Sequence, residues 1–147
     1  MTTLNLFKIV ASVLLAASSL AATGATFNVD TLGKTVLFFD EAHGNQVEFY
    51  DQDGHCFLWY PGNRKAVPGR WVVNGQDICF QYGKNTYNPV TGAKGNDWYC
   101  SPIDKWKERV VDTLVGDTFS LSTTGVPYRL PAKPQFESIS KMEKFGP

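Results

Sequence analysis

Residues 69–82 read Gly-Arg-Trp-Val-Val-Asn-Gly-Gln-Asp-Ile-Cys-Phe-Gln-Tyr, and this stretch decides the fold. Two runs rich in β-branched and aromatic residues flank Asn74-Gly75, whose residues tolerate the positive φ angles of a type I′ turn. From Asp77 to Tyr82 polar and apolar residues alternate, which is the period-2 pattern of a strand. The stretch therefore predicts a β-hairpin.

Further strand candidates come at short intervals on both sides of this hairpin. They are residues 35–40, 46–50, 55–60, 98–101 and 126–130. In the second of these, Val47 and Phe49 alternate with Gln46 and Glu48, as in a strand with one face in water. Short strands with a turn every 8 to 12 residues or so indicate an antiparallel meander. We therefore expect an all-β fold that forms a small barrel or sandwich.

The chain that follows the 98–101 strand fits two structures. Ser101-Pro102 is typical of the start of a helix, and apolar residues over 103–114 have helical spacing. Residues 110–115 are instead rich in β-formers, and Gly116-Asp117 resembles a hairpin turn before a strand at 118–121. We expect a short helical turn near 101–106 followed by strands, with a continuous helix as the alternative.

The first 25 residues have the pattern of a cleaved secretory signal peptide. Lys8 supplies the positive flank, Ile9 to Ala22 is an almost unbroken run of apolar and small residues, and small residues continue to Ala25. The run is shorter than the roughly 20 apolar residues that span a bilayer. We therefore expect a periplasmic or secreted protein in an oxidising compartment, with no integral membrane segment after cleavage.

Removing this segment leaves 122 of the 147 residues, which suits one domain. We expect a single β-rich domain over 26–130 and a flexible C-terminal tail over 131–147, where prolines are frequent and apolar periodicity is weak. Lys8 is the only charged residue removed, so 13 basic and 14 acidic residues remain. This balance argues against a nucleic-acid partner and against electrostatic attachment to an anionic membrane.

Three cysteines remain after cleavage, and three single pairings of them exist. We favour a Cys79–Cys100 disulfide, because each residue lies in a predicted strand next to a Gly- and Asn-rich loop at 83–96. Cys56 is then a free thiol. We interpret it first as a small buried residue, and the alternatives are an intermolecular disulfide or redox site, or a catalytic nucleophile.

Aromatic residues are dense between Phe49 and Trp106. We assign most of them to a β core, because aromatic side chains dominate core burial. Loops longer than about 12 residues are often functional, which draws attention to the aromatic residues in and beside 83–96. The candidate ligand-contacting residues are Trp59, Tyr87, Trp98 and Tyr99.

Acidic residues and histidines fall together in two turns. The first turn holds Asp40, Glu41 and His43, and the second holds Asp51, Asp53 and His55. A metal site needs three or four converging ligands, whereas Asp and Gly are common in turns for backbone reasons. We therefore expect solvated turns, no metal and no cofactor. The sequence contains no nucleophile elbow, phosphate-binding glycine loop or zinc-protease helix.

The hairpin at 69–82 and the later Asp97-Trp98-Tyr99-Cys100 together resemble a family of small exported bacterial proteins with a domain of unknown function, mainly from alphaproteobacteria. The family pattern is an Asp-Gly hairpin, a Gly-x-Trp strand, a Leu/Ile-Cys-Phe strand and a later Trp-x-Cys. The Asp-Gly element here is Asp53-Gly54, and the similarity runs from about Leu32 to Pro102. The resemblance implies a β-rich periplasmic domain with Cys79 and Cys100 paired. It implies no activity.

Three functions follow from these patterns. The first is a non-enzymatic binding or cell-envelope module that holds an envelope protein, a peptide or a glycan through its aromatic residues. The second is a hydrolase or enzyme inhibitor directed at cell-wall polymers, with His43 or the early carboxylates in a concave pocket. The third is a redox role for Cys56, which requires an accessible thiol of low pKa. We favour the first.

Overall fold

The protein is an antiparallel β-meander, as the sequence predicts. The computed structural model describes residues 30–83, 87, 92 and 94–145, so the signal peptide expected at 1–25 lies outside the described residues. The strands form one seven-stranded sheet in the order β6-β5-β4-β3-β2-β1-β7. The elements are β1 (Lys34–Asp40), β2 (Gly44–Tyr50), β3 (His55–Trp59), β4 (Val67–Asn74), β5 (Asp77–Tyr82), β6 (Tyr99–Pro102), α1 (Ile103–Lys107), β7 (Val110–Val115) and α2 (Ile139–Glu143).

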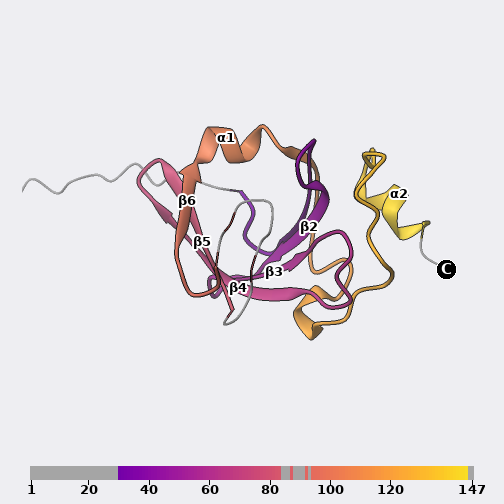
Figure 1. The fold of residues 1–147 in the computed structure, drawn as a ribbon, viewed down its shortest axis with the longest axis horizontal. Coiled ribbons are helices and arrows are strands. Elements are labelled where there is room, and N and C mark those ends of the chain that lie inside the picture. The colour runs from indigo at the N-terminus through magenta and orange to yellow at the C-terminus, as the bar shows by residue number, and fades with distance from the viewer. Residues whose placement is uncertain (1–29, 84–86, 88–91, 93, 146–147) are drawn as a thin grey trace, which may run out of the picture.

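The sheet curls into a half-barrel (Figure 1). It runs from β6 on one side, through β4 and β3, to β2 on the other, and α1 lies across the open side. This position of α1 follows from the chain order, because α1 connects β6 and β7, the two edge strands of the sheet. The fold is therefore a trough with one helix over its opening.

The hairpin of β4 and β5 is confirmed, but its turn differs from the prediction. Asn74 pairs with Asp77 in the register, so the two turn residues are Gly75 and Gln76. Gly75 has a φ of 63°, and Gln76 is not among the positive-φ residues. One positive φ at the first turn position is the pattern of a type II′ turn, whereas type I′ needs two. The prediction of type I′ is wrong because Asn74 stays in the strand.

The half-barrel buries side chains on both of its faces. The inner-face cluster is Val36, Phe38, Tyr50, Cys56, Ile78, Ile103 and Trp106. The outer-face cluster is Leu37, Val47, Trp59, Ala66, Leu121, Leu130, Ile139 and Met142. Successive residues of a strand alternate between these faces, as in β1, where Val36 and Phe38 point inward and Leu37 outward.

Burial on both faces corrects the expectation of a water-facing side on β2. Val47 packs on the outer face as predicted, but Glu48 is only 3% exposed on the inner face. Alternate side chains of β2 therefore enter two buried regions. The region on the outer face is mainly apolar, and the region on the inner face contains the Glu48 carboxyl group.

The segment after β6 forms a short helix and then a strand. The helix begins at Ile103, with Pro102 in the cap position and no side-chain cap, so Ser101 does not cap it as expected. Ile103 and Trp106 point into the trough. β7 follows and pairs with β1, which excludes the alternative of a continuous helix over 103–114.

The chain leaves the sheet at Gly116 and covers its outer face. The expected strands at 118–121 and 126–130 do not form, and a 3₁₀ turn occupies Leu121–Thr123. The Asp117 carboxylate accepts hydrogen bonds from the backbone N–H groups of Leu121 and Ser122, which favours this turn over a hairpin.

The C-terminal segment, expected to be a flexible tail, packs against the sheet over residues 131–145. Ile139 and Met142 on α2 are fully buried against the outer face. Figure 1 shows α2 outside the half-barrel, beyond β2. The apolar side chains that anchor this segment are spaced irregularly, which is why the sequence pattern did not indicate them. Among the described residues, no helix is both long and apolar enough to cross a membrane.

Candidate functional site

A cavity of about 310 Å³ opens on the inner face of the half-barrel. Its walls come from the sheet, from α1 and from the described part of the loop after β5. Aromatic rings make up much of the lining, namely Phe38, Tyr60, Phe80, Tyr82, Tyr87, Tyr99 and Trp106. The volume lies at the small end of the range for small-molecule sites, which run from about 300 to 1,000 Å³.

Glu48 on β2 supplies the buried polar group of this cavity. The hydroxyl of Tyr50 donates to its Oε2 at 2.6 Å, and the hydroxyl of Tyr82 donates to its Oε1 at 2.9 Å. The Cys56 thiol forms a further hydrogen bond with the same carboxyl. Three strands of the sheet therefore bring hydrogen-bonding groups to Glu48. Tyr50 comes from β2 itself, Cys56 from the adjacent β3, and Tyr82 from β5, on the far side of β4.

Burial is the largest cause of the pKa shifts of Glu48, Tyr50 and Tyr82. Removal from water raises the pKa of Glu48, and the hydrogen bonds from its three partners only partly offset this effect. Burial also raises the pKa of Tyr50 and Tyr82 well above the ordinary value, and the charge of Glu48 adds to the shift. All three groups therefore favour their neutral forms.

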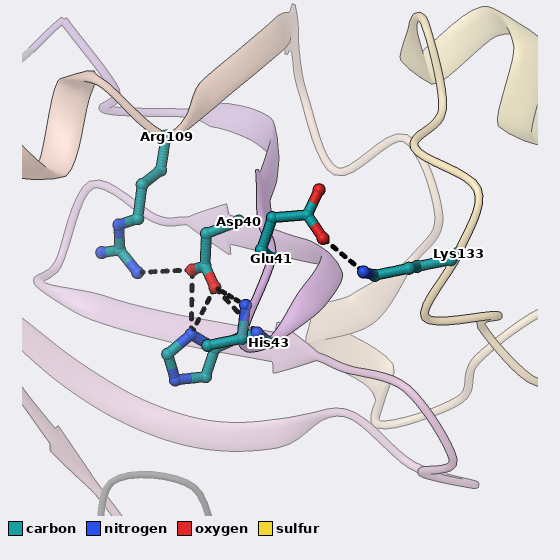
Figure 2. Close-up of polar contacts among 6 residues, drawn as sticks. Asp40, Glu41, His43, Arg109 and Lys133 are labelled. Atoms are coloured by element: carbon teal, nitrogen blue, oxygen red, sulfur yellow. Dashed lines mark hydrogen bonds and ion pairs between the residues drawn. The ribbon is translucent and has the colours of Figure 1, made fainter.

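Arg109 lies at the edge of the same cavity, directly before β7. Its Nη1 is 3.6 Å from Asp40 Oδ2, and its guanidinium lies over the Phe38 ring at 5.9 Å from the centroid. The backbone is fixed on both sides, because Arg109 N–H donates to the Trp106 carbonyl and the Arg109 carbonyl accepts from Phe39 N–H. Figure 2 shows Arg109 reaching from the end of α1 toward Asp40.

Asp40 connects Arg109 to His43. Its carboxylate accepts hydrogen bonds from the backbone and ring nitrogens of His43, with the ring Nδ1 at 2.8 Å (Figure 2). Burial acts to raise the pKa of Asp40, but these hydrogen bonds and the charges of His43 and Arg109 outweigh it and hold the pKa below its usual value. Asp40 therefore stays ionised and positions both basic side chains. His43, like Arg109, lines the cavity.

The other predicted turn residues do not join this site. Glu41 points away from Asp40 and pairs with Lys133 of the C-terminal segment (Figure 2). In the second turn, His55 Nδ1 lies 3.2 Å from the Asp51 carboxylate, and neither residue lines the cavity. Asp53 is exposed in the same turn. Within residues 30–83 and the later described ranges, no group of three potential metal ligands comes together.

Two of the four predicted ligand-contacting residues line the cavity. Tyr87 and Tyr99 do so and remain partly exposed, at 58% and 43%. Trp98 is 46% exposed and is not part of the lining. Trp59 is fully buried on the opposite face of the sheet, between Phe119 and Tyr128, so its assignment as a ligand contact does not hold. Side chains alternate between the two faces of β3, and Trp59 lies on the outer face.

The cysteines occupy two different environments. Cys79 and Cys100 form a disulfide between the paired strands β5 and β6. Such a bond is compatible with an extracellular or periplasmic protein. Cys56 is unpaired and fully buried, and burial together with the nearby Glu48 carboxyl raises the pKa of its thiol. A redox or nucleophilic thiol needs the opposite conditions, namely access and a lowered pKa.

The sequence pattern did not indicate the two residues that give the cavity its chemistry, Glu48 and Arg109. A glutamate alternating with apolar residues in a strand normally faces water, so nothing in the pattern marked Glu48 as buried. Arg109 follows a short helix that the sequence left ambiguous. The only available signal was the pair of tyrosines, Tyr50 and Tyr82, at the ends of two predicted strands. Comparison of the chain with known protein families, with curated proteins and with solved structures found no match.

Proposed function

We propose that the protein is an exported, non-enzymatic binding module that holds a small ligand in the cavity of its half-barrel. One observation carries this proposal. The cavity has aromatic walls and a buried hydrogen-bonding group, Glu48, whose geometry is set by Tyr50 and Tyr82. Sites for small molecules generally combine such apolar walls with a few fixed polar groups.

The packing of the fold supports a preformed site. The outer face is closed by the C-terminal segment, so the sheet that bears the cavity is backed by a second core. On the inner side, Ile103 and Trp106 of α1 are buried in the trough. The walls are thus held by packing on both sides, which lowers the ordering cost when a ligand binds.

Export is the second part of the proposal. It rests on the predicted signal peptide at 1–25 and on the Cys79–Cys100 disulfide. Intact mass spectrometry of the protein recovered from the periplasm or medium, without reduction, tests it. We expect a mass that lacks about 25 N-terminal residues and contains one disulfide. Retention of the full chain in the cytoplasm would contradict export.

The chemistry of the cavity favours binding over glycoside hydrolysis. Hydrolysis by the usual route needs two carboxyl groups facing one another across the substrate. Among the described lining residues Glu48 is the one carboxyl group, and both of its oxygens accept hydrogen bonds from tyrosine hydroxyls. A carboxyl group held in this way can orient a ligand or the tyrosines beside it. The second carboxyl group that hydrolysis needs is missing from the described lining.

The binding test uses N-phenyl-1-naphthylamine, an uncharged dye that fluoresces when it enters an apolar cavity. Ser101 on β6 lines the cavity, so a tryptophan at this position fills much of the space. We expect the wild type to bind the dye and Ser101→Trp to bind it at least about tenfold more weakly. Val67→Trp blocks the cavity from β4 and serves as a second variant.

Ser140→Trp is the matched control, because Ser140 is exposed on α2. It should leave dye binding unchanged. Circular dichroism establishes that each variant is folded. Undiminished binding to folded Ser101→Trp and Val67→Trp would contradict the proposal, and so would a wild type that does not bind the dye.

A further inference from the structure

The charges around the cavity indicate which ligands it can hold. Among the described residues of its lining, the ionisable side chains other than tyrosines are His43, Glu48, Lys94 and Arg109. Three of these are basic. The fourth, Glu48, is already engaged by hydrogen-bonding partners, and burial favours its neutral form. Basic side chains therefore outnumber acidic ones among the described residues of the lining.

Arg109 lies in the cavity lining and has N–H donors that could bind an anion there. A guanidinium carries five N–H donors in a planar fork. The contacts that the structure shows for this side chain are one long ion pair, 3.6 Å from Asp40, and stacking on the Phe38 ring. The side chain is 35% exposed and is part of the cavity lining. Asp40 orients the Arg109 guanidinium, and His43 in turn holds the Asp40 carboxylate. This single ion pair leaves most of the N–H donors of the guanidinium available.

The rest of the lining suits an apolar body. Phe38, Phe80, Tyr99 and Trp106 line the same cavity as Arg109. A cavity of about 310 Å³ holds a small molecule with one or two rings or a short branched chain. Inorganic phosphate or sulfate alone would leave this aromatic surface unused.

We propose, resting on the binding function above, that the cavity takes a small organic monoanion, with its acid group on the Arg109 guanidinium and its apolar body against the aromatic walls. Arginine suits this task because its fork matches a carboxylate or sulfonate and because it stacks on an aromatic ring without losing its donors. Lys94, in the loop after β5, adds a second positive charge on the lining.

Two dyes of the same ring system separate this inference from the binding function itself. One is 1-anilinonaphthalene-8-sulfonate, a monoanion, and the other is N-phenyl-1-naphthylamine, which lacks the sulfonate. Titration of wild type and Arg109→Gln with each dye measures the contribution of the acid group. We expect Arg109→Gln to weaken sulfonate binding about tenfold or more and to change binding of the uncharged dye less than about twofold. Added salt should weaken sulfonate binding to the wild type and have little effect on the variant.

Arg64→Gln is the matched control, since Arg64 is exposed in the β3–β4 connection away from the cavity lining. Arg109→Lys retains the charge and should restore part of the sulfonate affinity, which also guards against a misfolded glutamine variant. If Arg109→Gln and Arg109→Lys affect both dyes equally, or affect neither, the anion inference is overturned while the binding function stands. If the wild type binds neither dye, the binding function itself fails.

Discussion

The side-chain amide of Asn45, on β2, donates a hydrogen bond to the carbonyl oxygen of Pro134 at 2.8 Å, across 89 positions of sequence. The same Nδ2 also donates to the carbonyls of Pro131 and Ala132, and Oδ1 accepts from the backbone N–H of Phe136. Asn45 is fully buried. One side chain thus fixes the start of the C-terminal segment on the outer face of the half-barrel.

Asn45→Ala should lower the free energy of unfolding by about 2–4 kcal/mol, because it removes the hydrogen bonds that a fully buried side chain makes to three backbone carbonyls and one backbone N–H group. Asn45→Asp should cost at least as much, since a carboxylate retains the acceptor but loses both donors. Urea unfolding followed by circular dichroism measures the change. Asn74→Ala, at an exposed asparagine, is the control and should change stability by less than about 0.5 kcal/mol. Equal small effects at both positions would contradict the role of Asn45.

The sheet was predictable because local patterns determine it. The alternation of apolar residues in β2 and β5 and the glycine turns between strands are features of neighbouring residues, and the meander follows from them. The type of the β4–β5 turn was not predictable, because it depends on the register of pairing, in which Asn74 lies opposite Asp77. The packing of residues 131–145 depends on contacts with β2, far away in sequence, and leaves no periodic pattern.

The candidate site was only partly predictable for the same reason. Tyr87 and Tyr99 were identified because they lie in and beside a long loop, and they line the cavity. Trp59 was misassigned because a lone tryptophan in a strand does not reveal which face is the interior when both faces are covered. Glu48 is buried because its side of β2 faces the trough, and one of its hydrogen-bond partners, Tyr82, is 34 positions away.

Glu48 should make the stability of the protein depend on pH. Because burial raises its pKa above the ordinary value of 4.5, the folded state holds this proton more tightly than the unfolded chain does. The favourable contribution is complete below about pH 4.5 and is lost as the pH rises through the folded pKa. Glu48→Gln keeps a neutral hydrogen-bonding group for both tyrosines and removes the titration. The stability of the wild type relative to Glu48→Gln should therefore fall as the pH rises above about 4.5.

Urea unfolding of both proteins at a series of pH values measures this difference. Glu137→Gln provides the comparison, because it removes an exposed carboxyl group from the C-terminal segment. A difference between wild type and Glu48→Gln that stays constant with pH, or grows in favour of the wild type, would contradict the prediction.

Cys56 should be unreactive in the folded protein. Its thiol is buried on the inner face of β3 and its pKa is raised by burial, so little thiolate is present and reagents cannot reach it. Labelling with 5,5′-dithiobis(2-nitrobenzoate) should detect no thiol in the native state and one thiol per chain in denaturant. Ser140→Cys, which places a thiol on an exposed position of α2, should label rapidly and confirms that the reagent is active. Rapid native labelling of the wild type would revive the redox hypothesis.

The short helix α2 should stabilise the sheet far more than its five residues suggest. Ile139 and Met142 are fully buried on the outer face, where they pack in the cluster that contains Leu37, Val47 and Trp59. Truncation of either side chain leaves a cavity in that cluster, so Ile139→Ala and Met142→Ala should each lower the free energy of unfolding by about 2–5 kcal/mol. Ser140→Ala on the exposed face of the same helix should have little effect. Helix propensity cannot produce this contrast, because alanine is the best helix former at all three positions. Equal, small effects of the three substitutions in urea unfolding would show that the C-terminal segment is a loose tail after all.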